Sequence, residues 1–123
     1  MLITIERQDD VWVLRLSGRF AAGADIEYLR AKSDEVRSLN CAKVLVDLCD
    51  VPSMGSTAIG FVVGLYSSVT KNPAGRFVMV GAVPRVREVF DLTRLSEVIP
   101  SASDVPGGMA MLHRAASASG AIS

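Results

Sequence analysis

The chain has 123 residues, and 50% of them are hydrophobic, which is typical of one globular domain with its own buried core. Its 13 basic and 13 acidic residues cancel, so no long-range field attracts nucleic acid or an anionic membrane surface. No apolar run approaches the roughly 20 residues that span a bilayer, and the amino-terminal segment MLITIERQDD lacks the features of a secretory signal. We therefore expect a cytoplasmic protein that neither binds nucleic acid nor inserts into a membrane.

The first half of the chain predicts two strands, a helix and a third strand. Leu2–Ile5 and Val11–Leu16 have strand composition, and Gln8–Asp10 between them predicts the turn of an antiparallel hairpin. The segment after Gly18 has helical periodicity, with one face formed by Ile26, Leu29, Ser33 and Val36. The β-branched run Lys43–Asp47 predicts a central parallel strand that is buried on both faces.

Helices and strands continue to alternate in the second half of the chain. Ser56–Val69 predicts a helix whose buried stripe consists of Ile59, Val62, Val63 and Tyr66. Arg76–Gly81 predicts a strand, and Pro84 suits the first turn of a helix that runs to Leu92. Ser96–Ile99 predicts a short edge strand.

The last predicted helix begins after Asp104, whose carboxylate suits an N-cap, and it directs Val105, Met109 and Leu112 inward. Gly107–Gly108 weaken this helix, and we expect the Ser/Ala/Gly-rich tail, residues 116–123, to fray. The chain shows neither an internal repeat nor a linker. We therefore expect a single α/β domain over residues 1–115, with a small mixed β-sheet of about 4–5 strands packed with about four helices.

The helix predicted at Ser56–Val69 carries the functional prediction. Gly60, Gly64 and Ser68 share one of its faces, and each mid-helix glycine costs about 1 kcal/mol relative to alanine. Two interpretations explain this cost: the helix packs closely on its own sheet, or it offers a flat surface to another protein, with Phe61 and Leu65 as anchors.

The order of these segments resembles the STAS domain of bacterial anti-sigma factor antagonists. A strand leads into Asp47-Leu48-x-x-Val51, and a hydroxyl pair, Ser56 and Thr57, then opens a glycine-containing apolar helix. The GRFVMVG strand at 75–81 and the PRVREVF and LTRL segments at 84–90 and 92–95 agree. The resemblance runs from Leu2 to about Leu112, and residues 44–99 are its specific part.

The resemblance implies a protein partner and a phosphorylation switch. Members of the family bind an anti-sigma factor that is often a serine kinase of the histidine-kinase-like ATPase fold. Phosphorylation of a serine in an Asp-Ser-Ser/Thr-Gly motif breaks that complex. The matching motif is Gly55–Ser56–Thr57–Ala58, so Ser56 is the expected phosphoacceptor and Thr57 the weaker candidate. Gly55 replaces the family's aspartate, and Ala58 replaces its glycine.

We expect a non-enzymatic interaction module without a cofactor or metal. The predicted partner surface is Ser56, Thr57, Gly60, Phe61, Gly64 and Arg85, with the loops at Arg19–Phe20 and Ala82–Arg85 as secondary candidates. One alternative is a STAS scaffold in a signalling assembly, or an accessory to a transporter ATPase, without phosphorylation. A homodimer is left open. A second alternative is a small hydrolase, which would have to recruit the single histidine, His113.

Other patterns favour structural roles. Asp9, Asp10, Asp47 and Asp50 suggest a phosphorylated carboxylate with Mg²⁺, but a strand-like segment follows Asp10 directly, where such a site needs a helix. Cys41 and Cys49 flank a predicted strand and are expected to be reduced, mostly buried thiols. Arg85, Arg87 and Arg94 are most simply a solvated basic face.

Overall fold

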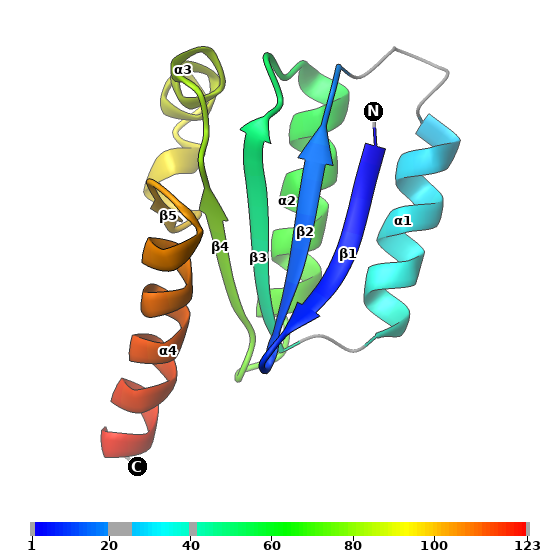
Figure 1. Cartoon of the computed structure of the whole chain (residues 1–123). Coiled ribbons are helices and arrows are strands. Elements are labelled where there is room, and N and C mark those ends of the chain that lie inside the picture. Colours follow the sequence, from blue (N-terminus) through cyan, green and yellow to red (C-terminus); the bar gives the residue numbers. More distant parts are fainter. Residues whose placement is uncertain (1, 20–25, 40–41, 123) are drawn as a thin grey trace.

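The computed structural model describes residues 2–19, 26–39 and 42–122, and the side chains of these ranges up to residue 113. Five strands form one sheet in the order β1-β2-β3-β4-β5, in which β1 is antiparallel to β2 and the other neighbours are parallel (Figure 1). The elements in chain order are β1 (Leu2–Gln8), β2 (Val11–Ser17), α1 (Ile26–Ser38), β3 (Lys43–Asp50), α2 (Ser56–Thr70), β4 (Arg76–Val80), α3 (Pro84–Leu92), the 3₁₀ turn Leu95–Glu97, β5 (Ser101–Ala102) and α4 (Val105–Ile122). The predicted α/β domain with a mixed sheet is confirmed.

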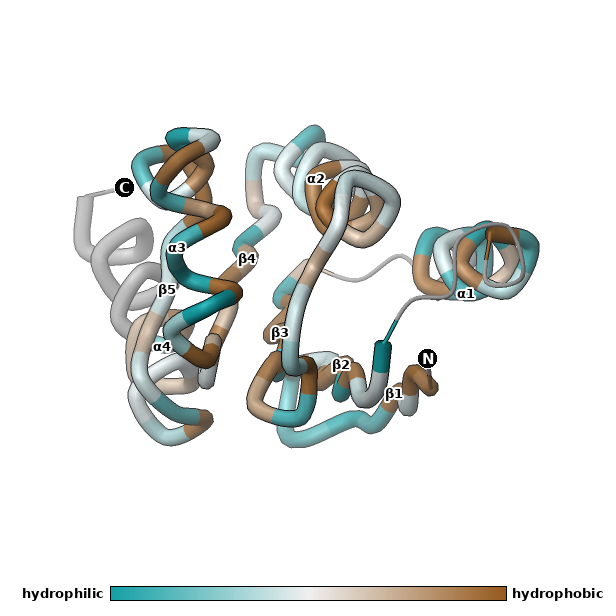
Figure 2. The backbone as a smooth tube through the Cα atoms, turned by 90° about the horizontal axis from the view of Figure 1, so that it is seen from above, coloured by the Kyte–Doolittle hydropathy of each residue, from teal (hydrophilic) through white to brown (hydrophobic). Residues whose placement is uncertain are grey.

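The sheet separates two cores. Side chains alternate along β3, so Val44, Val46 and Leu48 pack with α1, α2 and α3, whereas Leu45 packs with α4. Figure 2 shows α1 and α2 side by side on the same side of the strands. The predicted burial of this strand on both faces is confirmed, since Val44–Val46 are fully buried.

One glycine determines how α4 packs on the sheet. A Cβ atom at Gly108 would lie 2.4 Å from Val80 Cγ1 and 2.9 Å from Leu45 Cδ1. The helix therefore approaches β3 and β4 at a distance that only glycine permits. The backbone N–H of Gly107 donates a hydrogen bond of 2.8 Å to Asp104 Oδ1, which confirms the predicted cap.

The predicted strand at Ser96–Ile99 is wrong. Arg94 adopts a left-handed conformation with φ of 61°, and a 3₁₀ turn follows at Leu95–Glu97. The Ile99 N–H donates to the Leu95 carbonyl at 2.8 Å, a local bond that a strand does not make. Pairing with β4 begins only at Pro100, whose carbonyl accepts from the Met79 N–H at 3.0 Å, and the strand proper is Ser101–Ala102.

The hairpin prediction is confirmed, and the turn is formed by Asp9 and Asp10 because β1 extends through Gln8. At the outer edge of β1, the Tyr28 hydroxyl accepts a hydrogen bond from the Ile3 N–H at 2.9 Å. It also donates to the Ile3 carbonyl at 3.4 Å, so one side chain of α1 satisfies both backbone groups of an edge residue. Within the described residues, no helix is both long and apolar enough to cross a membrane.

Candidate interaction site at the start of α2

The loop between β3 and α2 is held in place by buried side chains, and its carboxyl end, where α2 begins, lies at the surface. Val51 is fully buried, and its N–H donates to the Leu48 carbonyl at 3.0 Å. Met54 is buried as well, and Gly55 then adopts an extended conformation as the N-cap residue of α2. Ser56 and Thr57, the first two residues of the helix, are therefore held at an exposed tip.

Neither hydroxyl has a structural partner. Within the described ranges, the side chains of Ser56 and Thr57 make no hydrogen bond, so neither hydroxyl satisfies an N–H group at the helix start. Gly55 provides no side-chain cap, and the first turn contains no acidic residue. The free N–H groups and the dipole of this 15-residue helix therefore give its start a partial positive charge that no carboxylate of the first turn offsets.

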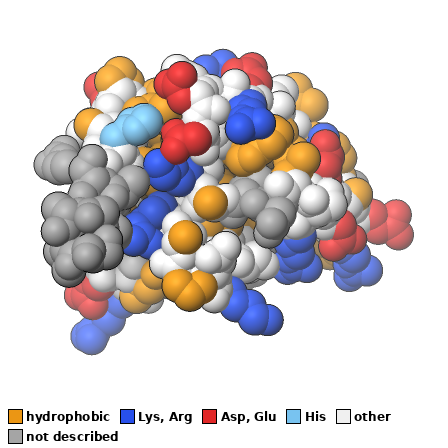
Figure 3. All heavy atoms as spheres, turned by 90° about the horizontal axis from the view of Figure 1, so that it is seen from below, with side chains coloured by type: hydrophobic (Ala, Val, Ile, Leu, Met, Phe, Trp, Pro, Cys, Tyr) orange, Lys and Arg blue, Asp and Glu red, His pale blue; other side chains and the backbone are white. Residues whose placement is uncertain are grey.

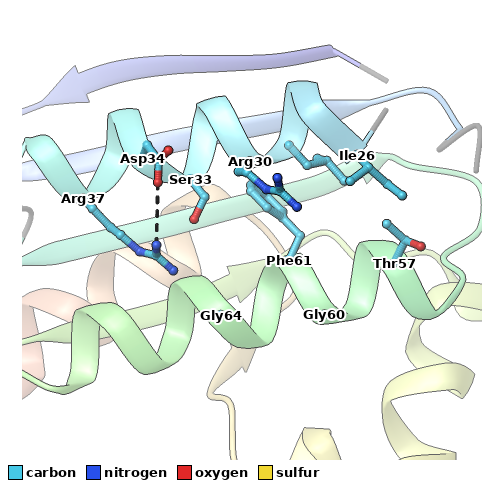
Figure 4. Close-up of a pocket in the computed structure, with 10 residues that line it drawn as sticks. Ile26, Arg30, Ser33, Asp34, Arg37, Thr57, Gly60, Phe61 and Gly64 are labelled. Carbon is cyan, nitrogen blue, oxygen red and sulfur yellow. Dashed lines mark ion pairs between the residues drawn. The ribbon is translucent and has the colours of Figure 1, made fainter. Parts of the chain in front are cut away.

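A groove of about 440 Å³ runs from Thr57 between α1 and α2 (Figure 4). One wall is α1, which contributes Arg30, Asp34 and Arg37, and the other is α2. Arg37 forms an ion pair with Asp34 at 3.7 Å and donates from Nε to Ser68 Oγ at 3.0 Å. Arg30 is exposed and has no ion pair within the described part of the chain, so the groove carries one uncompensated positive charge.

The two helix glycines face this groove rather than the sheet. Both Gly60 and Gly64 line it, and a Cβ atom at either position would have no heavy atom within 4 Å outside its own local backbone. The interpretation that they allow close packing on the domain's own sheet is therefore wrong. The helix turns its larger side chains inward, and the space left at the glycines is open.

The predicted stripe and anchors on α2 need correction. The residues that are buried are Ala58, Phe61, Val62, Leu65 and Val69, because α2 contacts both the sheet and α1. Ile59, Val63 and Tyr66 are only half-buried. Leu65 is fully buried and Phe61 is 9% exposed, so neither is a protruding anchor, although Phe61 contributes to the groove lining.

The structure separates Arg85 from the groove. Arg85 is exposed in the first turn of α3, and it does not line the α1–α2 groove. Arg19 is exposed after β2, while Phe20 lies outside the described residues. Conversely, the sequence prediction missed Arg30, Ser33 and Arg37. These residues are three and four positions apart in an amphipathic helix, and this spacing could have indicated that they share one face.

The acidic residues considered for a phosphorylated carboxylate lie at opposite ends of the sheet. Asp10 is at the start of β2, where the Lys43 ammonium donates a hydrogen bond to it and lowers its pKa, with smaller effects from the charges of Lys43 and His113. Asp47 and Asp50 lie in the second half of β3. Among the described side chains, no three His, Cys, Asp or Glu residues are grouped as they would be to hold a metal ion.

Cys49 was expected to be mostly buried, but it is exposed. Cys41 lies outside the described residues. The neighbouring Asp47 carboxylate accepts a hydrogen bond from the Cys49 N–H at 3.0 Å. Hydrogen bonding of the thiol to Asp47, followed by partial burial and the negative charges of Asp47 and Asp50, raises the pKa of Cys49 to about 11. This thiol is protonated at neutral pH and is a poor nucleophile.

The surface seen from below carries both signs of charge. In Figure 3, acidic and basic side chains are interspersed over this end of the molecule. Such a mixture lacks the one-sided basic face typical of nucleic-acid binding.

An anchored loop, an exposed hydroxyl pair at a helix start and a mixed sheet characterise this small α/β domain. The family model described as "STAS domain" matches residues 3–107, and the chain belongs to this family. No curated protein sequence matches the chain.

Solved structures share the fold. An anti-sigma factor antagonist from Mycobacterium paratuberculosis is 21% identical, with a TM-score of 0.81 over 91% of this chain and 93% of that one. An anti-sigma-factor antagonist (STAS) domain protein from Planctomyces limnophilus is 20% identical, with a TM-score of 0.79 over 90% and 97%. The Bacillus cell fate determinant SpoIIAA in its phosphorylated form is 23% identical, with a TM-score of 0.63 over 84% and 93%.

Proposed function

We propose that this protein is a cytoplasmic, non-enzymatic anti-sigma factor antagonist that binds an anti-sigma factor through the start of α2 and the adjoining α1–α2 groove. The observation that carries the proposal is the exposed Ser56 hydroxyl, which makes no hydrogen bond within the described residues and lies at a helix start without a side-chain cap. Membership of the STAS family and the likeness to anti-sigma factor antagonists support it.

Phosphorylation of Ser56 is the proposed switch. A phosphate adds a charge of roughly −1.5 to −2, and the free N–H groups and dipole of α2 would stabilise that charge in the isolated protein. In the complex the same charge would lie against the partner, where burial without a cationic group costs several kcal/mol. The phosphate therefore favours the free protein, and the partner we expect is itself the serine kinase, of the histidine-kinase-like ATPase fold.

The partner surface combines the hydroxyl pair with open glycines. Gly60 and Gly64 leave the α2 backbone accessible along the groove, so a partner can approach it closely. Arg30 adds an unpaired positive charge to the same groove. Arg85 remains a proposed contact on α3, outside the groove.

The experiment is to recover the tagged protein from its own lysate, identify the bound protein, and incubate the purified pair with ATP while measuring intact mass. We expect one phosphate, located at Ser56. Ser56→Asp should weaken partner binding at least tenfold, whereas Ser56→Ala should bind like the unchanged protein. The control Thr57→Ala should still take up one phosphate. Equal binding by Ser56→Asp and Ser56→Ala would refute the switch.

Gly55 favours a second candidate function, a STAS scaffold that is not phosphorylated. Where the family motif has a carboxylate, Gly55 has no side chain that could orient the neighbouring hydroxyl or contact a kinase. The scaffold predicts recovery of a multi-copy assembly or a transporter ATPase with no phosphate on the chain. A self-associated dimer in sedimentation would also favour it.

A further inference from the structure

A second cavity, separate from the α1–α2 groove, lies between α3 and the carboxyl ends of β4 and β5. Its volume is about 340 Å³, and it shares no lining residue with the α1–α2 groove. Its polar lining comes from Arg87, Ser96, Ser101 and Ser103.

The four polar side chains of this cavity are exposed, and no other described protein group is bonded to them. Within the described part of the chain, Arg87 forms no ion pair, although Asp91 lies one helical turn further along α3. The hydroxyls of the three serines make no hydrogen bond there either. Asp104, the acidic residue next to Ser103, already accepts the Gly107 N–H through Oδ1.

The charge of the lining is positive, because Arg87 is its only charged residue among those described. A guanidinium offers several N–H donors in a planar fork, and each hydroxyl adds one O–H donor. Four donor groups around one space match a tetrahedral oxyanion, which has acceptor oxygens on several sides. A carboxylate presents only two.

The remaining lining is apolar. Met79 is 3% exposed and Phe90 is 2% exposed, and they form the deeper part of the wall. The volume lies at the lower end of the range of roughly 300–1,000 Å³ typical of small-molecule sites. The cavity is therefore large enough for an oxyanion attached to a small apolar or ring-shaped body.

We infer that this cavity binds a small phosphate monoester, with the phosphate held by Arg87 and the serine hydroxyls and the organic part lying against Met79 and Phe90. The inference stands apart from the proposed function, because it uses neither Ser56 nor the α1–α2 groove. The two ideas can therefore fail independently.

The test uses phenyl phosphate as the probe and follows backbone amide shifts of the isotope-labelled protein. We expect saturable shifts centred on Ser96, Ser101 and Ser103. Inorganic phosphate should bind more weakly because it lacks the apolar part, and phenol should give no saturable shift there. Arg87→Gln should weaken phenyl phosphate binding roughly tenfold, the loss expected from one charge-assisted contact.

The matched control is Arg85→Gln, which removes an exposed arginine of the same helix that does not line the cavity. It should leave the affinity unchanged, and Ser101→Ala should weaken binding independently of any effect of Arg87→Gln on folding. Equal affinities of the Arg85→Gln and Arg87→Gln variants would overturn the inference. Shifts centred on Ser56 and Thr57 instead would overturn it as well, since the probe would then be binding the start of α2.

Discussion

Replacing Gly60 and Gly64 by alanine should make this domain more stable, not less. Glycine in a helix interior costs about 1 kcal/mol relative to alanine. A new methyl group at either position meets no heavy atom within 4 Å beyond its own stretch of helix, so no packing penalty opposes the gain. The double variant should therefore raise the free energy of unfolding by about 2 kcal/mol, which raises Tm by roughly 8 °C for a domain of this size.

The assay is urea denaturation of each variant, supported by calorimetry. Gly108→Ala is the matched control, because it makes the same substitution in a helix where the methyl group would overlap Val80 and Leu45. There, overpacking of about 1–3 kcal/mol opposes the same gain in helix propensity. Gly108→Ala should therefore be neutral or destabilising by up to about 2 kcal/mol.

A loss of stability in Gly60→Ala or Gly64→Ala would refute this reasoning, because it would mean that the α2 backbone is closely packed at those positions. The same variants also test the proposed partner surface. If the glycines are kept for a partner, the stabilised double variant should bind the anti-sigma factor more weakly. Stability and binding would then change in opposite directions, which a general folding defect cannot produce.

Three further predictions concern other elements. In a Cys41→Ser background, Cys49 should be alkylated slowly at pH 8, because a pKa of about 11 instead of 9.0 lowers its thiolate fraction about 100-fold. The rate should rise with pH up to that pKa, and Asp47→Asn should raise it at pH 8; equal rates in the two proteins would contradict the assigned cause. Asp104→Ala should lower the free energy of unfolding, measured by urea denaturation, by about 1 kcal/mol. Asp104→Ser should keep most of the stability of the unchanged protein, because serine also caps helices. Tyr28→Phe should cost about 1 kcal/mol and speed amide exchange at Ile3, and unchanged exchange would show that the hydroxyl does not protect this edge.

Much of the fold could be predicted because local sequence and tertiary packing agree. The β-branched run of β3, the turn at Asp9–Asp10, and Pro84 at the start of α3 each point to the conformation that the structure adopts. The prediction at Ser96–Ile99 failed because its composition permits a strand. The left-handed Arg94 and the bond from the Val98 N–H to the Leu95 carbonyl instead make its first part a 3₁₀ turn. Such a turn depends on how the chain leaves α3, which no local pattern encodes.

The position of the candidate site in the sequence could be predicted, but the residues that surround it in space could not. Ser56 and Thr57 could be placed at the start of α2 from sequence, and the structure leaves both exposed. The buried face of α2 could not be predicted, because α1 and the sheet together cover a wider part of the helix surface than one apolar stripe. Phe61 and Leu65 therefore turned inward, and Arg30 came to the groove from a helix that lies far away in sequence.

Two tyrosine hydroxyls bear on how copies of this domain can assemble. Tyr28 occupies the backbone groups of Ile3 at one margin of the sheet, and Tyr66 donates to the Val98 carbonyl at 3.3 Å beside the short β5 at the other. Tyr28 thus removes the backbone groups of one residue from the β1 margin, and β5 has only two residues to offer to an incoming strand. Many copies could be crowded together without their sheets fusing, and their contacts would then be made by helices and loops, which separate without breaking a strand ladder.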